Sequence, residues 1–309
     1  MVGAGAAQTR QIAHPDARDR GIDHLRPLEL ISHADMARLH PTGDHPERRE
    51  RLTALQSTFE WREAPPATRE DVERCHSPEL VALIDAIDRP VMLTLDTIAS
   101  QTTYEAALLA AGATIEAARV GGFALVRPPG HHATREQAMG FCFFNNVAIA
   151  ARVVRSELGL ERIAIVDWDV HHGNGTEDVF LDDPSVFYVS LHQWPLYPGT
   201  GAQDDQGETL LNVPLPAGST DEDYLRAFDE LVEPAVTTFQ PDLVLVSAGF
   251  DAHEHDPLAG MLVTDAGFRE LARRSAALGP RVAAVLEGGY NLETLPSLLR
   301  AALDGFDAA

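Results

Sequence analysis

The sequence predicts an α/β protein with a single domain, built on an open, mostly parallel sheet with helices on both faces. Two observations lead to this prediction. Short apolar runs alternate with longer helical segments, and five of the runs end abruptly in loops rich in Gly, His or other polar residues. In addition, no repeat, low-complexity tract or linker divides the 309 residues. The five runs span residues 123–126, 163–166, 186–191, 243–247 and 282–286.

The part of the chain before residue 100 has the weaker patterns. Residues 1–27 show no strong period, so we expect a loosely ordered N-terminal segment and a domain that spans 28–309. A short apolar strand is predicted over 28–31, and a second strand over 71–76. Helices are predicted to begin near Pro46 and at Ser77-Pro78-Glu79, because Ser and Pro favour the first helical turn.

The later helices have clearer signals. An Ala-rich helix is predicted over 102–120, where Gly121 and Gly122 end it. Acidic residues at the start of 220–239 favour a helix there, because they complement the helix dipole. A further short strand is predicted over 210–213. The remaining predicted helices span 140–158, 264–278 and 292–303.

The composition excludes several classes of protein. The formal charge of -23 argues against nucleic acid as a direct partner, since phosphates would be repelled. No apolar run approaches the roughly 20 residues that cross a membrane, so no membrane association is expected. Cys75 and Cys142 form no C-x-x-C motif and indicate neither a disulfide framework nor a thiolate metal site. We therefore expect a cytoplasmic protein.

The segment Val166–Thr176, VDWDVHHGNGT, is where we expect a metal site. It follows a buried strand, where uncompensated charge is expensive. Residues two apart on an extended backbone point to the same face, so Asp169 and His171 can reach one point, with Asp167 one step behind. One carboxylate and one imidazole on the same face are typical of the beginning of a divalent-metal site.

A catalytic metal needs at least one more protein ligand. Asp251 and Asp256 are the candidates, and Pro257 holds Asp256 in an extended conformation. His253 and His255 lie in the same loop, and spacing alone does not exclude them.

Two further motifs offer proton transfer and oxyanion stabilisation. A neutral imidazole of the His131-His132 pair is suited to accept a proton near neutral pH. Tyr290 follows two glycines, which let the backbone approach a ligand closely, and its hydroxyl can donate to a developing oxyanion. Phe141 and Phe143 are candidates for the core, and one of them could line a narrow apolar channel.

Five motifs in order resemble the zinc-dependent histone deacetylases, with class II-like bacterial deacetylases and acetylpolyamine amidohydrolases closest. The likeness covers about residues 28–303 and implies the arginase-deacetylase fold, with a deacetylase-like catalytic domain over 28–309. The motifs are PPGHH at 128–132, GFCFFN at 140–145, DWDVHHGNGT at 167–176, GFDAHEHDP at 249–257 and EGGY at 287–290.

The resemblance implies a role for each matching residue. Tyr290 would polarise the amide carbonyl, and His131 and His132 would be the general base and acid pair. Asp167 would orient His131. Asn174 stands where many relatives have an aspartate, so His132 is expected to be the proton shuttle. The ligands of one Zn²⁺ per chain would be Asp169, His171 and Asp256.

The resemblance also implies a substrate channel and a second ion. Asp96 would be a rim residue that holds the substrate backbone, and Arg51 would lie near the foot of the pocket. The channel wall would comprise Gly140, Phe141, Leu196, Tyr197 and Leu258. Potassium would be bound, largely by main-chain carbonyls, at Asp167, Asp169, His171, Ser190 and Leu191.

The resemblance implies a deacetylase that acts on N-acetyl-lysine in proteins or peptides, or alternatively on acetylated polyamines or small acetylated metabolites. Polyamine-selective relatives tend to place a glutamate at the position of Leu258, so this leucine favours acyl-lysine. A non-catalytic acyl-lysine binding module is a rival of another class. A ureohydrolase on the same fold is a second rival, which would need two metals roughly 3.5–4 Å apart.

Overall fold

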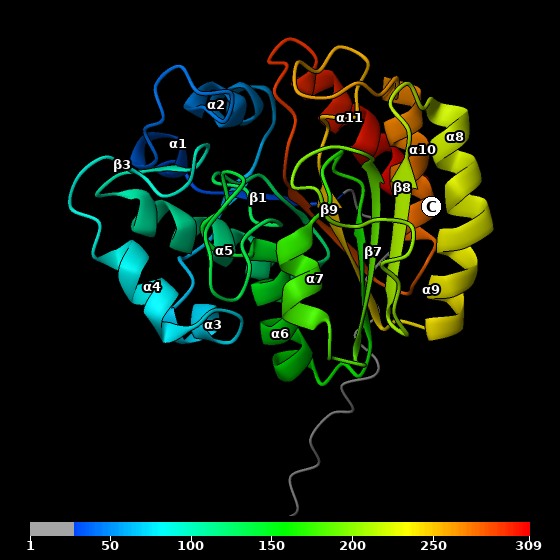
Figure 1. Ribbon diagram of the computed structural model, residues 1–309, viewed down its shortest axis with the longest axis horizontal. Helices are drawn as coiled ribbons and strands as arrows, with labels where there is room; N and C mark the ends of the chain where they lie inside the picture. Colours follow the sequence, from blue (N-terminus) through cyan, green and yellow to red (C-terminus); the bar gives the residue numbers. More distant parts are fainter. Residues whose placement is uncertain (1–27) are drawn as a thin grey trace, which may run out of the picture.

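The computed structural model describes residues 28–309 and contains an eight-stranded sheet in which every neighbouring pair of strands is parallel. The sheet confirms the predicted fold class (Figure 1). In spatial order its strands are β2 (Arg62–Glu63), β1 (Leu30–Ser32), β5 (Phe123–Ala124), β10 (Val282–Leu286), β9 (Leu243–Ala248), β6 (Ile163–Asp167), β7 (Val186–Gln193) and β8 (Leu210–Leu215). A separate antiparallel hairpin comprises β3 (Val91–Met92) and β4 (Ile98–Ala99).

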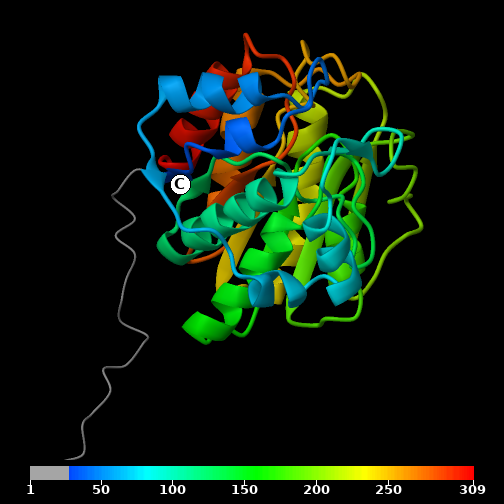
Figure 2. The ribbon, with the colours of Figure 1, turned by 90° about the vertical axis from the view of Figure 1, so that its left-hand side faces the viewer.

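Helices cover both faces of the sheet. One face packs against α5 (Thr103–Val120) and α6 (Asn146–Leu158), and the other against α10 (Asp265–Ala276) and α11 (Leu295–Phe306) (Figures 1 and 2). The remaining helices are α1 (Met36–Leu39), α2 (Arg49–Thr58), α3 (Arg69–Glu73), α4 (Pro78–Asp85), α7 (Asn174–Phe180), α8 (Asp221–Ala227) and α9 (Glu233–Phe239), with a π-helical turn over Phe228–Val232 between the last two.

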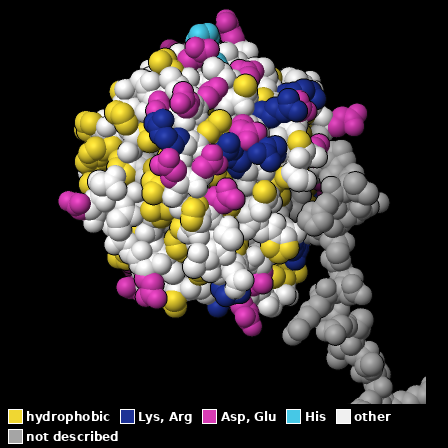
Figure 3. Space-filling view, turned by 90° about the vertical axis from the view of Figure 1, so that its right-hand side faces the viewer, with side chains coloured by type: hydrophobic (Ala, Val, Ile, Leu, Met, Phe, Trp, Pro, Cys, Tyr) yellow, Lys and Arg dark blue, Asp and Glu magenta, His cyan; other side chains and the backbone are white. Residues whose placement is uncertain are grey.

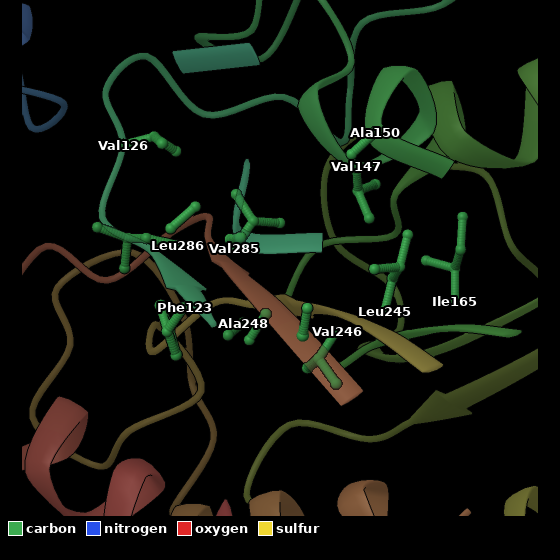
Figure 4. Close-up of a cluster of buried hydrophobic side chains, with 14 of the residues drawn as sticks. Phe123, Val126, Val147, Ala150, Ile165, Leu245, Val246, Ala248, Val285 and Leu286 are labelled. Carbon is green, nitrogen blue, oxygen red and sulfur yellow. The ribbon is translucent and has the colours of Figure 1, made fainter. Parts of the chain in front are cut away.

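The core forms where β-branched and other apolar side chains of the central strands meet α6. Every residue of β6, β7 and β9 is buried, as expected for strands covered on both faces. Val147 and Ala150 of α6 face the strand residues Ile165 and Leu245 in this core (Figure 4). Such close packing fixes the strand ends, and the loops that follow them, in one arrangement.

Helix ends follow the predicted signals at Ser77 and Gly121, and a third cap, at Asn145, was not predicted. Ser77 caps α4 by accepting from the backbone N–H of Leu80 at 3.2 Å. Gly121 ends α5 in the left-handed conformation, with φ of 74°. Asn145 caps α6 by accepting from the N–H of Ala148 at 3.1 Å.

Two predicted elements were wrong. The segment 71–76, predicted as a strand, instead forms the second part of α3, up to Glu73, and the turn that follows it. The reason is that Thr68 and Asp71 form a reciprocal capping box that begins a helix. The helix predicted over 140–158 begins only at Asn146, since Gly140 and Phe141 both have positive φ values, 56° and 69°.

The predicted N-terminal segment 1–27 lies outside the described residues. Within 28–309, no helix has both the length and the apolar character needed to cross a bilayer. The face formed by α8 to α10 carries arginines beside acidic side chains, including the pairs Arg226–Asp223 and Arg273–Glu270 (Figure 3). Charge on that face is therefore locally compensated.

Candidate metal centre and active site

The candidate site lies where the parallel strands end. In a parallel sheet, the loops after all strands emerge at one edge, which is the usual place for a ligand. Asp167 is the last residue of β6 and lies opposite Ser190 of β7 and Ser247 of β9. The loops that follow β5, β6, β9 and β10 carry the other predicted polar residues to the same edge.

Three potential metal ligands converge at this edge. One donor atom from each of Asp169, His171 and Asp251 lies within 4.8 Å of the other two. Nδ1 of His171 is 3.1 Å from Oδ1 of Asp169 and 3.2 Å from Oδ2 of Asp251. Asp251, which the sequence offered as one of two candidates for the third ligand, is completely buried and also accepts from the N–H of Val170.

Asp256 is not a member of that three-residue cluster. Its Oδ2 accepts from the N–H of Tyr290 at 2.6 Å, and its Oδ1 accepts from the N–H of Leu258 at 3.0 Å. Burial, followed by the charge of Asp251, raises the pKa of Asp256 to about 7. Both of its hydrogen bonds are to residues that line the pocket described below.

The donor set fits a divalent cation. Burial disfavours the carboxylate of Asp169, but the charges of His131 and His171 hold its pKa well below the usual range. Burial and the charge of Asp169 raise the pKa of Asp251, which shows that these carboxylates repel each other. A divalent ion would offset this repulsion, and two carboxylates with one imidazole are a common ligand set for such ions.

Gly288 completes the wall of the cluster. Its N–H donates to Oδ2 of Asp169 at 2.7 Å. A Cβ at this position would overlap with the carboxylates of both Asp169 and Asp251. The first EGGY glycine is therefore required for close approach of the backbone to the charged groups.

His131 is buried behind the cluster and paired with a carboxylate. Its Nδ1 lies 2.9 Å from Oδ2 of Asp167, which also accepts from the Tyr188 hydroxyl at 3.0 Å. Burial opposes the imidazolium, but Asp167 and Asp169 outweigh burial and raise the pKa of His131 to about 10. A cation on Asp169 would weaken this attraction, so metal binding would lower the pKa.

The surroundings of His132 lower its pKa, whereas those of His131 raise its pKa. Nδ1 of His132 lies 2.8 Å from Oδ1 of Asn174, the first residue of α7. An amide oxygen only accepts, so the proton lies on Nδ1 and leaves the Nε2 lone pair available. Burial, then the positive charges of His131 and His171, hold the pKa of His132 well below 6.5. A neutral imidazole with a free lone pair is a suitable general base.

A pocket of about 180 Å³ opens beside His132 and His171. It brings together every residue that the sequence assigned to a substrate channel. Those residues are Asp96, Gly140, Phe141, Leu196, Tyr197 and Leu258, and Tyr290 also lines the cavity.

Gly140 and Phe141, which both have positive φ, shape one wall of this pocket. The Cα of Gly140 lies against the ring of His132, and a Cβ there would overlap with that ring. Phe141, held by its N–H donating to Oγ1 of Thr97 at 3.1 Å, packs edge-on against Tyr290 with ring centroids 5.8 Å apart. The strained backbone of Phe141 therefore places an aromatic side chain beside the phenol.

Two buried residues, Glu287 and Arg51, fix the loop of His131 and the loop of Tyr290 by hydrogen bonds to their backbones. The carboxylate of Glu287 accepts from the N–H groups of Gly130 and His131, at 2.7 and 3.2 Å. The guanidinium of Arg51 donates to the carbonyls of Glu287 and Gly289 and lies 4.7 Å from the centre of the Tyr290 ring. No role for Glu287 was predictable from local sequence, because its partners lie more than 150 residues away along the chain.

The residues predicted for potassium lie on the adjacent strands β6 and β7 and in the loop that follows β6. Ser190 and Leu191 belong to β7, and Ser190 is the register partner of Asp167. The hydroxyl of Ser190 lies 2.9 Å from Nδ1 of His192. Asp169 and His171 follow directly after β6, so all five predicted residues occupy one region of the sheet edge.

Comparison with known proteins finds one family over most of the chain. A model of the histone deacetylase domain matches residues 40–306. Histone deacetylase 10, chloroplastic, of Oryza sativa subsp. japonica is 41% identical over 318 residues, which cover 88% of this chain and 72% of that protein. Polyamine deacetylase HDAC10 of Mus musculus is 40% identical over 307 residues, covering 86% of this chain and 46% of that protein.

A solved structure matches the fold as well. The crystal structure of the HDA15 HD domain superposes with a TM-score of 0.85 and 37% sequence identity, over 90% of this chain and 87% of that chain.

Proposed function

Because the chain belongs to the histone deacetylase family, we propose that it is a metal-dependent amidohydrolase that removes acetyl groups from amines, most readily from N-acetyl-lysine in peptides or proteins. The observation that carries this proposal is the pocket in which His132, His171 and Tyr290 meet one apolar channel. A catalytically silent acyl-lysine binder would not need this combination of a base, a metal ligand and a phenol.

We propose Asp169, His171 and Asp256 as ligands of one Zn²⁺ per chain. Asp256 is preferred over Asp251 because it is bonded to the backbone of Leu258 and Tyr290, both of which line the pocket. Asp251, which is completely buried, would orient His171 from behind. A zinc ion held there would polarise the substrate carbonyl and lower the pKa of a water molecule.

His132 is the proposed proton shuttle. It lines the pocket and is neutral at pH 7, so its Nε2 can accept a proton from the attacking water and pass it to the leaving amine. His131 lies behind it, with ring centroids 4.1 Å apart, and remains paired with Asp167. Burial, followed by the positive charges of His131 and His171, lowers the pKa of His132 and thereby keeps the shuttle unprotonated.

Tyr290 is the proposed oxyanion donor. Burial raises the pKa of its phenol well above 10, so the hydroxyl keeps its proton and can donate it in a hydrogen bond. Its ring is held between Phe141 and the guanidinium of Arg51. A donor fixed in this way needs little reorganisation as negative charge develops on the carbonyl oxygen.

Asn174→Asp is expected to shift the pH profile of the enzyme. A carboxylate beside Nδ1 would favour the imidazolium and raise the pKa of His132 by about one unit or more. His132 must be neutral to act as a base, so the acidic limb of kcat/KM should move to higher pH by the same amount. The measurement is kcat/KM between pH 5 and 9 for the wild type, Asn174→Asp and Asn174→Gln. An unchanged acidic limb in Asn174→Asp would show that His132 is not the base.

Leu258→Glu is expected to change substrate preference. Leu258 lines the pocket, and a carboxylate there would attract the free ammonium groups of an acetylated polyamine. The ratio of kcat/KM for N-acetylspermidine to that for an acetyl-lysine peptide should rise about tenfold, which corresponds to roughly 1.4 kcal/mol. Leu258→Gln adds polarity without charge and should leave the ratio near its wild-type value. Equal ratios in all three proteins would remove Leu258 from substrate selection.

Two further proposals concern the surroundings of the reaction. We propose that K⁺ binds at Asp167, Asp169, His171, Ser190 and Leu191, largely through main-chain carbonyls. The register pairing of Asp167 with Ser190 supports this proposal.

We also propose a cytoplasmic location, which the two free and buried cysteines, Cys75 and Cys142, support.

The direct test is a hydrolysis assay with a fluorogenic acetyl-lysine peptide, run beside N-acetylputrescine and N-acetylspermidine, with and without a chelator. We expect turnover that is highest for the peptide, lost with chelator and restored by Zn²⁺. Binding of the peptide without turnover by metal-loaded protein would support the silent binding module instead.

A further inference from the structure

A second cavity, of about 300 Å³, lies at the opposite end of the sheet from the active site. It is formed by the end of α3, one side of α6 and the first residue of β7, Val186. The active-site loops follow the other end of β7, eight residues on, which places the two cavities roughly 25 Å apart. The polar residues that line it are Arg74, Arg152, Arg155, Ser156 and Asp183.

The arginines of this cavity are only weakly paired with carboxylates, although Asp183 lies in the same lining. Elsewhere, ion-paired arginines such as Arg62 and Arg119 hold a carboxylate at 2.7 Å. In the cavity, Arg74 approaches Asp71 only to 3.7 Å, and Arg152 approaches Asp183 only to 3.7 Å.

Arg155 forms no ion pair with any residue of 28–309, and its Nε reaches only the carbonyl of Glu161, at 3.4 Å. Three guanidinium groups thus border one cavity with weak internal compensation.

Contacts with α7 hold the Arg152 side chain in place at the wall of the cavity. One of its terminal nitrogens donates to the carbonyl of Val179 at 3.1 Å, and its guanidinium lies 5.2 Å from the centre of the Phe180 ring. Its Nε is buried and forms no hydrogen bond within the described part of the chain.

We propose that this cavity binds a small phosphate-bearing molecule. The guanidinium fork matches the oxygens of a phosphate group with two parallel hydrogen bonds, and Arg is preferred for such recognition. The hydroxyl of Ser156 adds a further donor at the same cavity. The three guanidinium groups supply positive charge for a phosphate group in a chain whose formal charge is -23.

The test is calorimetric titration of the full, metal-loaded chain with inorganic phosphate and, separately, with adenosine monophosphate. We expect one site with a dissociation constant at or below about 1 mM for at least one of the two ligands. Equal affinities would indicate that the phosphate group alone is recognised, whereas tighter binding of the nucleotide would indicate a phosphorylated metabolite. No heat of binding up to about 20 mM of either ligand would overturn the proposal.

Substitution of the cavity arginines tests whether the phosphate binds in this cavity. Arg155→Ala and Arg74→Ala change exposed side chains and should each weaken binding about tenfold, the effect of losing one charge-assisted contact. Arg155→Lys should recover part of the loss. Arg269→Ala removes the same charge from an exposed position on α10 and should bind as the wild type does. Phosphate held at the metal centre instead would keep its full affinity in Arg155→Ala and Arg74→Ala, and this result would also refute the site.

Discussion

Replacing Tyr290 with Phe is expected to lower kcat by a factor on the order of 10²–10³, the usual loss when one oxyanion donor is removed. The phenylalanine ring keeps the contacts with Phe141 and Arg51, so the fold and the metal content should not change. The measurement is single-turnover kinetics on an acetyl-lysine peptide, with the metal content of the same sample determined in parallel.

Tyr197→Phe is the matched control for this variant. Tyr197 also lines the pocket, and its ring packs edge-on against His132 with centroids 5.2 Å apart. Tyr197 forms part of the pocket wall and is not a proposed oxyanion donor. Removal of its hydroxyl should therefore lower kcat by less than about tenfold. Wild-type turnover in Tyr290→Phe, or an equal loss in both variants, would remove Tyr290 from the proposed mechanism.

Asp169→Asn is expected to abolish metal binding and, with it, hydrolysis. Asp169 lies at the centre of the site: its two oxygens accept from the N–H groups of His171 and Gly288, and its low pKa keeps it ionised. A neutral amide is a much poorer ligand for a divalent ion than a carboxylate. Bound metal measured after dialysis should therefore fall close to zero, and turnover should fall to background.

The control for Asp169→Asn is the same change at Asp304, which is exposed on α11. Asp304→Asn should keep full metal content and activity. Because Asp169 is buried, thermal unfolding and circular dichroism of Asp169→Asn must show that the variant is folded. A folded Asp169→Asn protein with one metal per chain would contradict the assignment of Asp169 as a ligand.

Much of the fold follows from local signals in the sequence. Runs such as 163–166 and 243–247 are apolar and end in Gly, Asp or His, which predicts parallel strands whose loops share one edge. The strand prediction for 71–76 failed although a signal was present: Thr68 and Asp71 have the spacing of a capping box. The start of α6 was predicted too early, because the positive φ of Phe141 could not be predicted from the sequence.

The site was predictable only in part, since long-range packing determines which side chains meet. The Asp-x-His spacing placed Asp169 and His171 together, because two alternate residues share a face. Choosing between Asp251 and Asp256 needs the path of the loop after β9, which local sequence does not determine. The positions of Glu287 and Arg51 likewise depend on contacts between segments more than 150 residues apart.

Anomalous diffraction from a crystal of the zinc-loaded protein would test the central claim most directly. We expect a single zinc peak at about 2.0–2.2 Å from oxygens of Asp169 and Asp256 and a ring nitrogen of His171, open toward the pocket. Two peaks roughly 3.5–4 Å apart would indicate the ureohydrolase arrangement instead. A single peak away from Asp169 and His171 would contradict the proposed chemistry.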